Sequence, residues 1–548
     1  MRNIWAVARH SLAQCLRMKV AAVFIVILAI MLVTLPMVMQ GDGTLAGKIR
    51  TLLAYGTGLT AVLLSLVTVL LSVAVVTSDV EAKRIFMVAT KPLARWQYIL
   101  GRFLGVVLLD VLLLAVAGAS IYGAAQYLRR QTPLNPDDRR RVETEVFASR
   151  GRVTPQPVDV EAKVQDRTRR LQEEGRYQQA LEAYRAKTGG DADRAKKMLD
   201  DQIREEETAA AQSVGVGGIF NWSFKGIKTI GQPVSTTGKI LDAEPKYLLY
   251  RIQAPATILG RLVYGGPVQI NGVVASTAQV GQDYFEAQFF KRDIANAAVL
   301  SLSKGSEVRI DIDPTIQLTY RASTASDPPD KTLQSLWQFQ NSKTGFLYQV
   351  PRGDAIRTNS TLTVSARVVD DEGRTEVQYL NLPWDVSGLG SSVTILNSDV
   401  SILFPVDRFE WNFLRGLLLV LMQLIFLAAV GVFAGSFLSF PVACLVSFTV
   451  LPVALARTFL VGAMTVVPSA SRPEQILQVI GGHLVSVLNA LLPDLAKTMP
   501  SELLADGLNI PWSLLATAAI LTVVLRAGLA LLLACWIFSR RELARVQV

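Results

Sequence analysis

Histidine and cysteine are both scarce in this sequence of 548 residues. The two histidines, His10 and His483, lie far apart, and isolated histidines of this kind are usually structural. The three cysteines, Cys15, Cys444 and Cys535, all lie in or beside apolar segments. The polar middle of the chain therefore lacks the commonest general base and the thiols of a disulfide framework or a CxxC metal site. We expect a protein that is not itself an enzyme and that holds no metal or other cofactor.

Long apolar runs are absent from residues 130–410 but frequent elsewhere in the chain. The mean hydropathy is +0.34 although 18% of the residues are charged, because apolar blocks alternate with polar ones. Six runs are near or above the roughly 20 residues that a helix needs to cross a bilayer: 20–39, 52–77, 99–123, 413–437, 442–466 and 512–538. Since helices satisfy their own backbone hydrogen bonds in lipid, the sequence predicts an α-helical polytopic membrane protein with about six transmembrane helices.

Basic residues gather beside these runs on one side only. Lys and Arg are frequent in residues 1–19 and 83–102 and in the C-terminal tail, whereas residues 40–50 and 467–511 hold two each. Positive charge in short loops marks the cytoplasmic side. We expect an inner-membrane protein with both termini cytoplasmic and with residues 124–411 and 467–511 outside. These loops also account for the net charge of +10, so we expect the lipid bilayer, and no nucleic acid, as a partner.

The expected domains follow from this topology. Residues 1–19 are predicted to be an amphipathic helix in the cytoplasmic interface, because Ile4, Ala8, Leu12 and Cys15/Leu16 fall at helical spacing. The alternative is a disordered basic leader. The remaining domains are transmembrane helices 1–3 in 20–128 with a coupling helix at 79–92, a charged extracytoplasmic helical hairpin in 129–215, an extracytoplasmic β-rich domain in 216–408, and transmembrane helices 4–6 in 409–548 with an extracytoplasmic segment at 467–511.

The segment between the second and third runs, residues 78–102, carries the most specific pattern. A charged start leads into a short apolar-faced stretch with Ile85 and Phe86, and Pro92 ends it, because the residue before a proline is disfavoured in helix. The pattern predicts a short helix that two spans hold at the cytoplasmic surface. Such a helix can dock its face in a groove of a soluble partner.

This segment resembles the stretch E-x-G-T-L-E-L-L-L-S-K-P-V-S-R-W-x-Y-L-x-G-K of ABC-2 type exporter permeases, in particular the six-span permeases grouped with multicopper-enzyme maturation and gliding-motility exporters. The matching positions are Glu81, Thr90-Lys91-Pro92, Arg95-Trp96, Tyr98 and Gly101-Arg102, and Lys83-Arg84-Ile85 stands where the family usually has Gly-Thr. Residues 491–495 and 538–543, around the last run, also resemble the family. The resemblance covers about residues 1–128 and 400–548.

The resemblance implies a coupling helix that contacts a separate ABC ATPase subunit, and a transport unit of two permeases, either a homodimer or a heterodimer. The expected ATPase contacts are Glu81, Lys83, Arg84, Ile85, Phe86, Thr90, Lys91 and Pro92. Export of an unknown substrate is the implied direction. The chain is not expected to hydrolyse ATP itself, because Gly41–Ile49 fails the phosphate-loop pattern at Asp42 and Ile49.

The insert has two textures. Residues 160–187 and 191–211 have helical composition and predict the helical hairpin, for which the alternative is a solvated charged arm with no binding role. From about residue 219, short runs rich in Val, Ile, Tyr, Phe and Thr predict a β-sandwich-like domain. These strands are expected at 247–256, 267–275, 283–290, 307–313, 315–321, 345–349, 360–369 and 375–382. A docking module for an extracytoplasmic protein partner is the expected role.

Two charges lie inside the predicted spans. Asp110 in the third run and Arg526 in the last run both lie roughly 16–18 Å from the cytoplasmic ends of their runs at 1.5 Å per residue. Pairing would relieve the cost of burying either charge alone, so an Asp110–Arg526 ion pair is predicted. It would fix helix packing, or break during transport and line the substrate path. Alternatively, each charge faces water or a dimer partner.

Two other classes of protein remain open. The first is a non-transporting membrane protein that anchors or signals across the envelope and whose outer domain binds a partner. The second is a secondary transporter, which typically shows inverted repeats and broken helices near the midplane. The mostly continuous apolar runs and the scarcity of acidic residues within them favour the permease over the secondary transporter.

Overall fold

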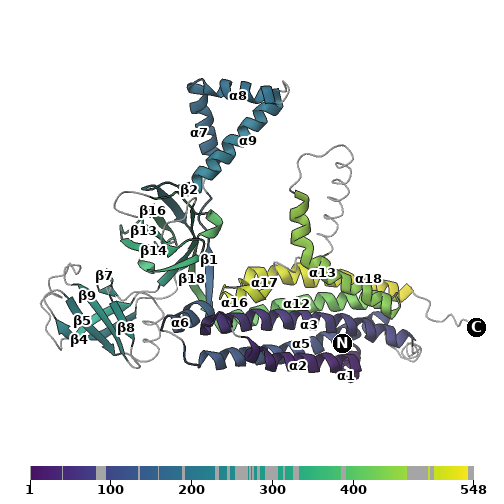
Figure 1. The fold of residues 1–548 in the computed structure, drawn as a ribbon. Coiled ribbons are helices and arrows are strands. Elements are labelled where there is room, and N and C mark those ends of the chain that lie inside the picture. Colours follow the sequence, from purple (N-terminus) through teal and green to yellow (C-terminus); the bar gives the residue numbers. More distant parts are fainter. Residues whose placement is uncertain are drawn as a thin grey trace, which may run out of the picture. The chain divides into compact units, whose positions relative to one another are not determined.

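The computed structural model describes residues 2–39, 41–81, 94–133, 136–157, 160–187, 192–228, 234–243, 247–253, 269–270, 273–274, 277–280, 284–290, 307–312, 315–324, 332–383, 390–465, 492–493 and 499–540. The chain forms two compact units (Figure 1). Unit 1 comprises Met1–Ser149 and Asp407–Val548, and it is a helical bundle. Unit 2 comprises Arg150–Val406 and combines separate β-sheets with three helices.

Unit 1 consists mainly of helices, and the long ones coincide closely with the apolar runs. The helices are α1 (Arg2–Arg17), α2 (Lys19–Val38), α3 (Leu45–Glu81), α5 (Arg95–Arg129), α6 (Pro136–Arg141), η1 (Val142–Val146), α12 (Phe409–Gly435), α13 (Phe440–Thr465), α16 (Pro500–Ala505), α17 (Trp512–Ala518), η5 (Ala519–Ala527) and α18 (Gly528–Arg540). Of these, η1 and η5 are π-helical, and η5 continues α17 into α18.

Four helices are long and apolar enough to cross a membrane within the described part of the chain: Leu45–Asp79, Arg95–Arg129, Phe409–Gly435 and Trp512–Arg540. A fifth is added if Arg2–Arg17 and Ala22–Val38, which meet at 71°, count as one bent span. The described part of α13 adds a shorter apolar helix, Phe440–Ala456. At 37 residues, α3 is about 56 Å long, well beyond the roughly 30 Å of a hydrocarbon core. The protein is therefore mostly helical, with four or five helices of membrane-spanning character.

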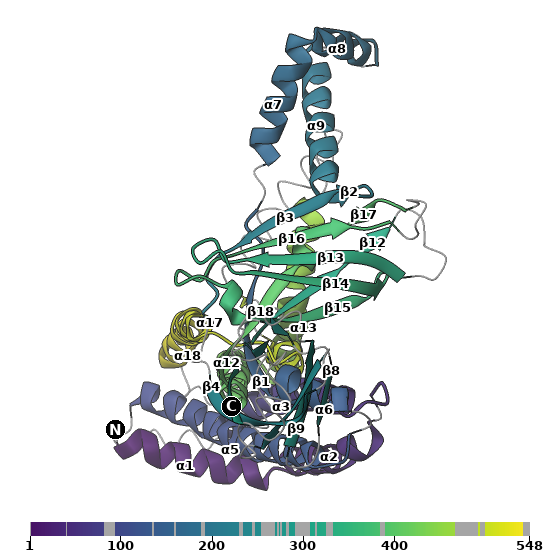
Figure 2. The same ribbon diagram turned by 90° about the vertical axis from the view of Figure 1, so that its left-hand side faces the viewer.

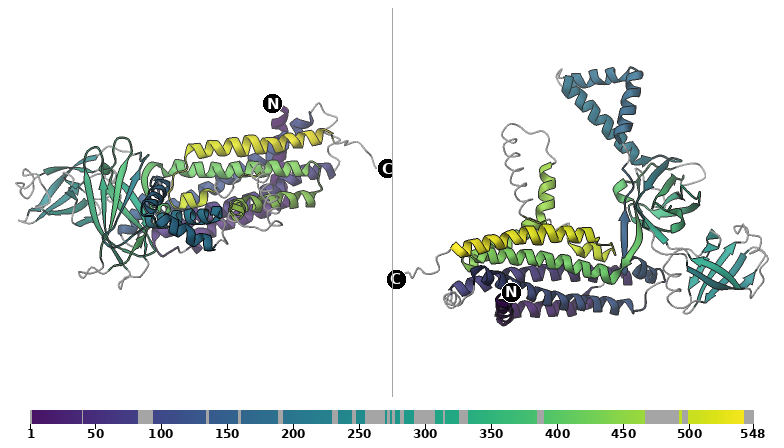
Figure 3. Two further views of the ribbon diagram at one scale, coloured as in Figure 1. Left: turned by 90° about the horizontal axis from the view of Figure 1, so that it is seen from above. Right: turned by 180° about the vertical axis from the view of Figure 1, so that it is seen from behind.

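The centre of the bundle is α3, which packs against both α5 and α12. In Figure 3, α12 and α18 also run side by side, and they are in contact. Small residues let α3 and α12 approach closely, because a Cβ on Gly431 would lie 1.8 Å from the Ser72 hydroxyl oxygen. Close approach at small residues is the usual basis of helix packing in lipid, where apolar side chains gain little by leaving the lipid tails.

Residues 136–146 belong to the bundle, although the sequence placed everything from 129 to 215 in the arm. Asp138 in α6 accepts hydrogen bonds from the backbone N–H groups of Leu45 (2.8 Å) and Ala46 (3.0 Å) at the start of α3. In η1, Glu143 pairs with Arg129 and Glu145 with Arg50. Asp138 thereby complements the Thr44 side chain, which accepts from the Gly47 N–H (2.9 Å), so that three N–H groups at the start of α3 have side-chain acceptors.

The charged arm of unit 2 has three helices, α7 (Val160–Glu173), α8 (Arg176–Lys187) and α9 (Ala192–Ala211), which form a triangle in Figure 1. The predicted helix 160–187 is interrupted because Gly175 has a φ of +67°, a left-handed conformation that helices do not contain. Val164, Tyr177, Leu199 and Ile203 form the small core that all three helices share. Residues 160–187 and 192–211 are thus helical as predicted, but they form three helices where the sequence predicted a hairpin of two.

Two four-stranded sheets of unit 2 share an aromatic core (Figure 2). One has the order β1-β18-β11-β15, and the other has the order β14-β13-β16-β3. The bounds are β1 (Ala148–Val153), β3 (Ile219–Phe224), β11 (Thr315–Arg321), β13 (Thr332–Gln340), β14 (Leu347–Ala355), β15 (Asn359–Ser365), β16 (Thr375–Asn381) and β18 (Ser401–Arg408). All described pairings in these sheets are antiparallel. Trp337, on β13, lies at the centre of the core and is fully buried.

The remaining strands form smaller sheets. A five-stranded sheet has the order β10-β4-β5-β9-β8, a three-stranded sheet the order β12-β17-β2, and β6 pairs with β7. Their bounds are β2 (Ser213–Val214), β4 (Val234–Ala243), β5 (Tyr247–Gln253), β6 (Gln269–Ile270), β7 (Val273–Val274), β8 (Thr277–Val280), β9 (Tyr284–Phe290), β10 (Glu307–Ile312), β12 (Ser323–Thr324) and β17 (Val393–Thr394). The single-turn 3₁₀ helices η3 (Ala366–Val368) and η4 (Asn397–Asp399) lie between strands. Each expected range thus contains a strand. The strands that were not predicted are β1, β2, β3, β4, β8, β12, β13, β17 and β18.

Candidate functional site

The predicted coupling segment connects α3 to α5. Glu81 is the last residue of α3, and α5 begins at Arg95. The other expected contact residues, Lys83, Arg84, Ile85, Phe86, Thr90, Lys91 and Pro92, lie outside the described residues. The candidate site is therefore built from the helix ends on either side of this segment and from the helices packed around them.

A buried ion pair joins these two helix ends. The Arg102 guanidinium of α5 pairs with the Asp79 carboxylate of α3, and both side chains are at most 5% exposed. The Tyr98 hydroxyl donates a second hydrogen bond, of 2.6 Å, to the same carboxylate. A buried pair without further hydrogen bonds would cost more in lost hydration than it returns, so the additional donor matters. The pair fixes the distance between the two ends of the coupling segment.

Helix α1 is the third helix that contributes side chains to this site. Arg102 also donates to the Gln14 side-chain oxygen (2.6 Å) and to the Ser11 hydroxyl (3.2 Å), and Gln14 reaches the Ser78 hydroxyl on α3 (3.4 Å). The N-terminal helix is thereby hydrogen-bonded to both helices that flank the coupling segment. We call these groups, Ser11, Gln14, Asp79, Tyr98 and Arg102, the Arg102 cluster.

Two glycines let α1 lie against α5 (Figure 2). A Cβ on Gly101 would lie 2.6 Å from the Val7 Cβ, and one on Gly105 would lie 2.3 Å from the Ser11 Cβ. Their spacing of four residues puts both on one face of α5, as in the G-x-x-x-G pattern of close helix pairs. Helix α1 is confirmed as a helix, and Ala8 and Cys15 of the predicted stripe are buried, whereas Leu16 is 45% exposed. Ser11, which was not part of that stripe, is buried as well, on the side that lies against Gly105.

The last helix closes the same end of the bundle. Arg95 donates to the backbone carbonyl oxygens of Ser539 (2.7 Å) and Phe538 (3.4 Å), and the rings of Tyr98 and Phe538 stack with centroids 5.6 Å apart. Residues 95–98 and 538–539, which belong to two of the segments that carry the sequence resemblance, are thus in direct contact. Basic side chains that bind the last carbonyls of a helix are a common C-terminal cap.

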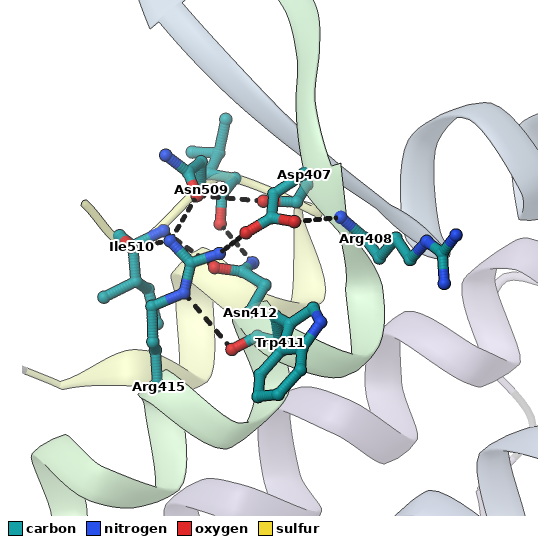
Figure 4. Close-up of polar contacts among 9 residues, drawn as sticks. Asp407, Arg408, Trp411, Asn412, Arg415, Asn509 and Ile510 are labelled. Atoms are coloured by element: carbon teal, nitrogen blue, oxygen red, sulfur yellow. Dashed lines mark hydrogen bonds and ion pairs between the residues drawn. The ribbon is translucent and has the colours of Figure 1, made fainter. Parts of the chain in front are cut away.

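A second polar cluster lies at the start of α12, directly after β18 (Figure 4). The nearly buried Arg415 pairs with Asp407 and donates to the Asn509 side-chain oxygen (3.0 Å) and the Ile510 carbonyl (2.7 Å). Asn412 completes the clamp by donating to the Leu508 carbonyl (2.7 Å) and accepting from the Ile510 N–H (2.8 Å). This cluster ties the start of α12 to the chain that leads into the last helix.

The two intramembrane charges are not partners among the ion pairs of the described residues. Asp110 is fully buried on α5 and its carboxylate lies 2.8 Å from the Thr68 hydroxyl of α3. Arg526 is half-buried in η5, which packs against α12 and α17, whereas contacts to α5 come from the later α18. Both residues lie on helices of the same bundle, but the π-helical stretch that carries Arg526 packs against α12 and α17.

Sequence reasoning missed Asp79, Ser11 and Gln14 of the Arg102 cluster. Asp79 was visible as an acid at the end of an apolar run, with Arg102 at the start of the next one. Opposite charges at matched positions of two successive spans were a usable signal. Ser11 and Gln14 gave none, because polar residues on a basic helix look solvent-exposed until the partner helix is known.

Comparisons with models of known protein families, with curated proteins and with solved structures gave no match for this chain. Among the described residues there is also no group of three or more His, Cys, Asp or Glu side chains that could hold a metal ion. The proposed function therefore depends on the sequence pattern and on the geometry above.

Proposed function

We propose that this protein is the membrane subunit of an ABC-2 type export complex, powered by a separate ATPase subunit that binds the coupling segment 79–92. A second permease, identical or different, completes the transport unit. Six spans are proposed, formed by α2, α3, α5, α12, α13 and the continuous helix from α17 to α18. The protein lies in the inner membrane, with both termini in the cytoplasm and unit 2 on the outer side.

One observation carries this proposal: two of the three sequence segments that resemble the permease family meet, at residues 95–98 and 538–539, although more than 430 residues separate them. Arg95 caps the end of α18, and Tyr98 stacks on Phe538. A force on that segment would pass directly to α3, α5, α1 and α18, which the Arg102 cluster and the Arg95 cap hold together.

The last helix is suited to lipid or to a second permease. Its large apolar side chains are widely exposed within the single chain, including Val524 (65%), Leu525 (55%) and Leu532 (70%). Apolar faces of this kind are stable only when lipid or another membrane helix covers them. The proposal requires no bound cofactor in this chain.

Purification of the intact complex tests the proposal. The full-length chain, extracted from native membranes in mild detergent, is expected to retain an ATPase subunit. Glu81→Lys combined with Arg84→Glu reverses both charges of the coupling segment and should release that subunit. The matched control is Glu173→Lys with Arg176→Glu, the same two residue types three positions apart on exposed parts of the arm, which should retain it.

Two results would overturn the proposal. One is the absence of any ATPase subunit from the wild-type preparation under conditions in which the bundle remains folded. The other is ATP hydrolysis by the purified chain alone, once a control preparation has excluded contaminating enzymes.

An anchoring or signalling role is the second candidate, and the arm favours it. Arg169 and Arg170 pair with Asp166, yet their side chains remain 69% and 66% exposed. Helix α7 therefore has positive charge on its surface that a binding partner could contact. In that case the purified chain would retain a partner through unit 2 and no ATPase. Deletion of the coupling segment would then leave the complex intact.

A further inference from the structure

A polar group lies deep inside the bundle, between α3 and α5. Asp110 is fully buried, and it lies eight residues beyond Arg102, about 12 Å further along the helix axis. Its Oδ1 atom lies 2.8 Å from the Thr68 hydroxyl oxygen, and its Oδ2 atom has no hydrogen-bond partner among the described residues. The surrounding side chains belong to the apolar core, including Val106, Leu109 and Leu113.

The Thr68 hydroxyl has two neighbours but only one hydrogen. Its oxygen lies 2.7 Å from the Leu64 carbonyl and 2.8 Å from the Asp110 carboxyl. The Leu64 carbonyl and an ionised carboxylate can both only accept, so the single hydroxyl hydrogen serves one of them and leaves the other contact without a proton. Both contacts are hydrogen bonds at once if Thr68 donates to Leu64 and a protonated Asp110 carboxyl donates to Thr68. With an ionised carboxylate, one of the two contacts would bring two acceptor oxygens together.

The charges on neighbouring helices do not neutralise Asp110. From α1, the Cys15 thiol lies within electrostatic reach of both Asp110 and Arg102. From α5 itself and α3, Arg102 and Asp79 are already paired with each other. The other charged groups on packed helices lie towards helix ends, on the exposed side of α1 or on η5: Arg2, Arg9 and Arg17 on α1, Lys19 on α2, Lys48, Arg50 and Glu81 on α3, Arg95 and Arg129 on α5, Glu410 and Arg415 on α12, Arg526 on η5 and Arg540 on α18. An ionised Asp110 would therefore be an unpaired charge in the apolar core, which is far costlier than a neutral acid.

A metal cation is a poor alternative ligand. Hard cations take about six or more oxygen ligands, and the oxygens placed here are those of Asp110 and Thr68. A proton, by contrast, is carried by one carboxyl oxygen and needs only one further oxygen as its hydrogen-bond acceptor.

We propose that Asp110 is a proton-binding site, occupied in this conformation, and that the bound proton closes the hydrogen-bond chain Asp110–Thr68–Leu64 between α5 and α3. Proton loss removes that chain and leaves a charge facing α3, so the two helices must separate far enough to admit water. Protonation of Asp110 thus stabilises the packed arrangement of the two helices that flank the coupling segment. The inference rests on the geometry of the bundle and is independent of the proposed function.

Infrared spectroscopy of the full-length protein in lipid vesicles tests this site directly. At pH 7 the wild-type protein should show the carbonyl stretching band of a protonated carboxylic acid, and that band should shift in heavy water. Asp110→Asn, which keeps the shape and can donate to Thr68, should remove the band with little change in melting temperature. Thr68→Val, which removes the acceptor but keeps the volume, should shift the band. Asp42→Asn is the matched control, because the Thr44 hydroxyl and N–H donate to Asp42 in an exposed turn and lower the pKa of that carboxyl.

Each outcome decides the question. A wild-type spectrum without an acid band at pH 7 overturns the proposal, whatever the variants do. A band that responds to neither Asp110→Asn nor Thr68→Val also overturns it. If Asp110→Asn fails to fold, the band shift in Thr68→Val still distinguishes a protonated Asp110 from an ionised one.

Discussion

Arg102 on α5 and Asp79 on α3 form an ion pair whose side chains are only 5% and 3% exposed. Asp79 lies two residues before the end of α3 and Arg102 seven residues after the start of α5, so their pairing holds together the two helices that residues 82–94 connect. The same guanidinium also binds α1, which means that one side chain holds three helices at a single point. Removal of either member should therefore affect more than one helix.

Arg102→Ala is expected to destabilise the bundle by about 3–5 kcal/mol, because it leaves the buried Asp79 carboxylate without its cation. Asp79→Leu combined with Arg102→Met should cost clearly less, since no charge is then left unpaired. Thermal unfolding in detergent, followed by circular dichroism, measures both. A double variant that is as unstable as Arg102→Ala would contradict this account of the pair.

Gly105→Ala should loosen α1 from α5, because the new methyl group would meet the Ser11 Cβ at 2.3 Å. Overpacking of this kind costs about 1–3 kcal/mol. The measurement is maleimide labelling of Cys15, which is fully buried, in a background in which Cys444 and Cys535 are replaced by Ala. Gly123→Ala is the control on the same helix, since nothing lies within 4 Å of its Cβ. Equal labelling of the two variants would show that the glycine contact is unimportant.

Arg415→Ala should weaken the clamp between α12 and residues 509–510. It leaves the Ile510 carbonyl and the Asn509 oxygen without this donor, at a cost of about 1–3 kcal/mol. Arg408→Ala is the neighbouring control, because that side chain is exposed. Proteolysis of the chain between α16 and α17 should increase in the first variant and not in the second. Unchanged cleavage in both would refute the role of the clamp.

Cysteine labelling tests the proposed topology. Thr90→Cys and Asp371→Cys, each in a chain without native cysteines, should react with an impermeant maleimide from opposite sides of the membrane. Asp371 is chosen because it is exposed, whereas the neighbouring Asp370 is buried and accepts backbone hydrogen bonds. Reaction of both positions from the same side would require a different arrangement of spans.

Residues 150–406, expressed alone, should fold as a unit with more strand than helix by circular dichroism. Trp337→Ala should destabilise that fragment by about 3–5 kcal/mol, because the ring is fully buried and packs against Trp222, Tyr320 and Tyr379. Leu347→Ala is the control, since Leu347 is 47% exposed. Chemical denaturation measures both variants, and similar midpoints would argue against Trp337 as the centre of the core.

The long helices were predictable from sequence because lipid requires continuous apolar helices. Helices α3 and α5 contain their predicted runs, and α12 covers all but the last two residues of its run. Their ends extend beyond the runs, since polar helix ends are stabilised by contacts such as Asp138 on Leu45 that no local pattern announces. The turn at Gly175 was missed because a single glycine is tolerated in many helices. Depth along a span is readable from sequence, but the direction in which a side chain points is not. That is why Asp110 and Arg526 seemed matched, although Asp110 faces Thr68.

The cap that Asp138 provides for α3 also has a consequence for biosynthesis. The N–H groups of Leu45 and Ala46 obtain their acceptor from a residue that is translated more than ninety positions later. The first turn of α3 is therefore completed only after α5 has been made and inserted, and the Arg95 cap on Ser539 must wait for almost the entire chain. Chains truncated before residue 138 are therefore expected to insert α3 with two N–H groups that still lack their acceptor, and chains truncated before α18 leave the Arg95 guanidinium without the Ser539 carbonyl.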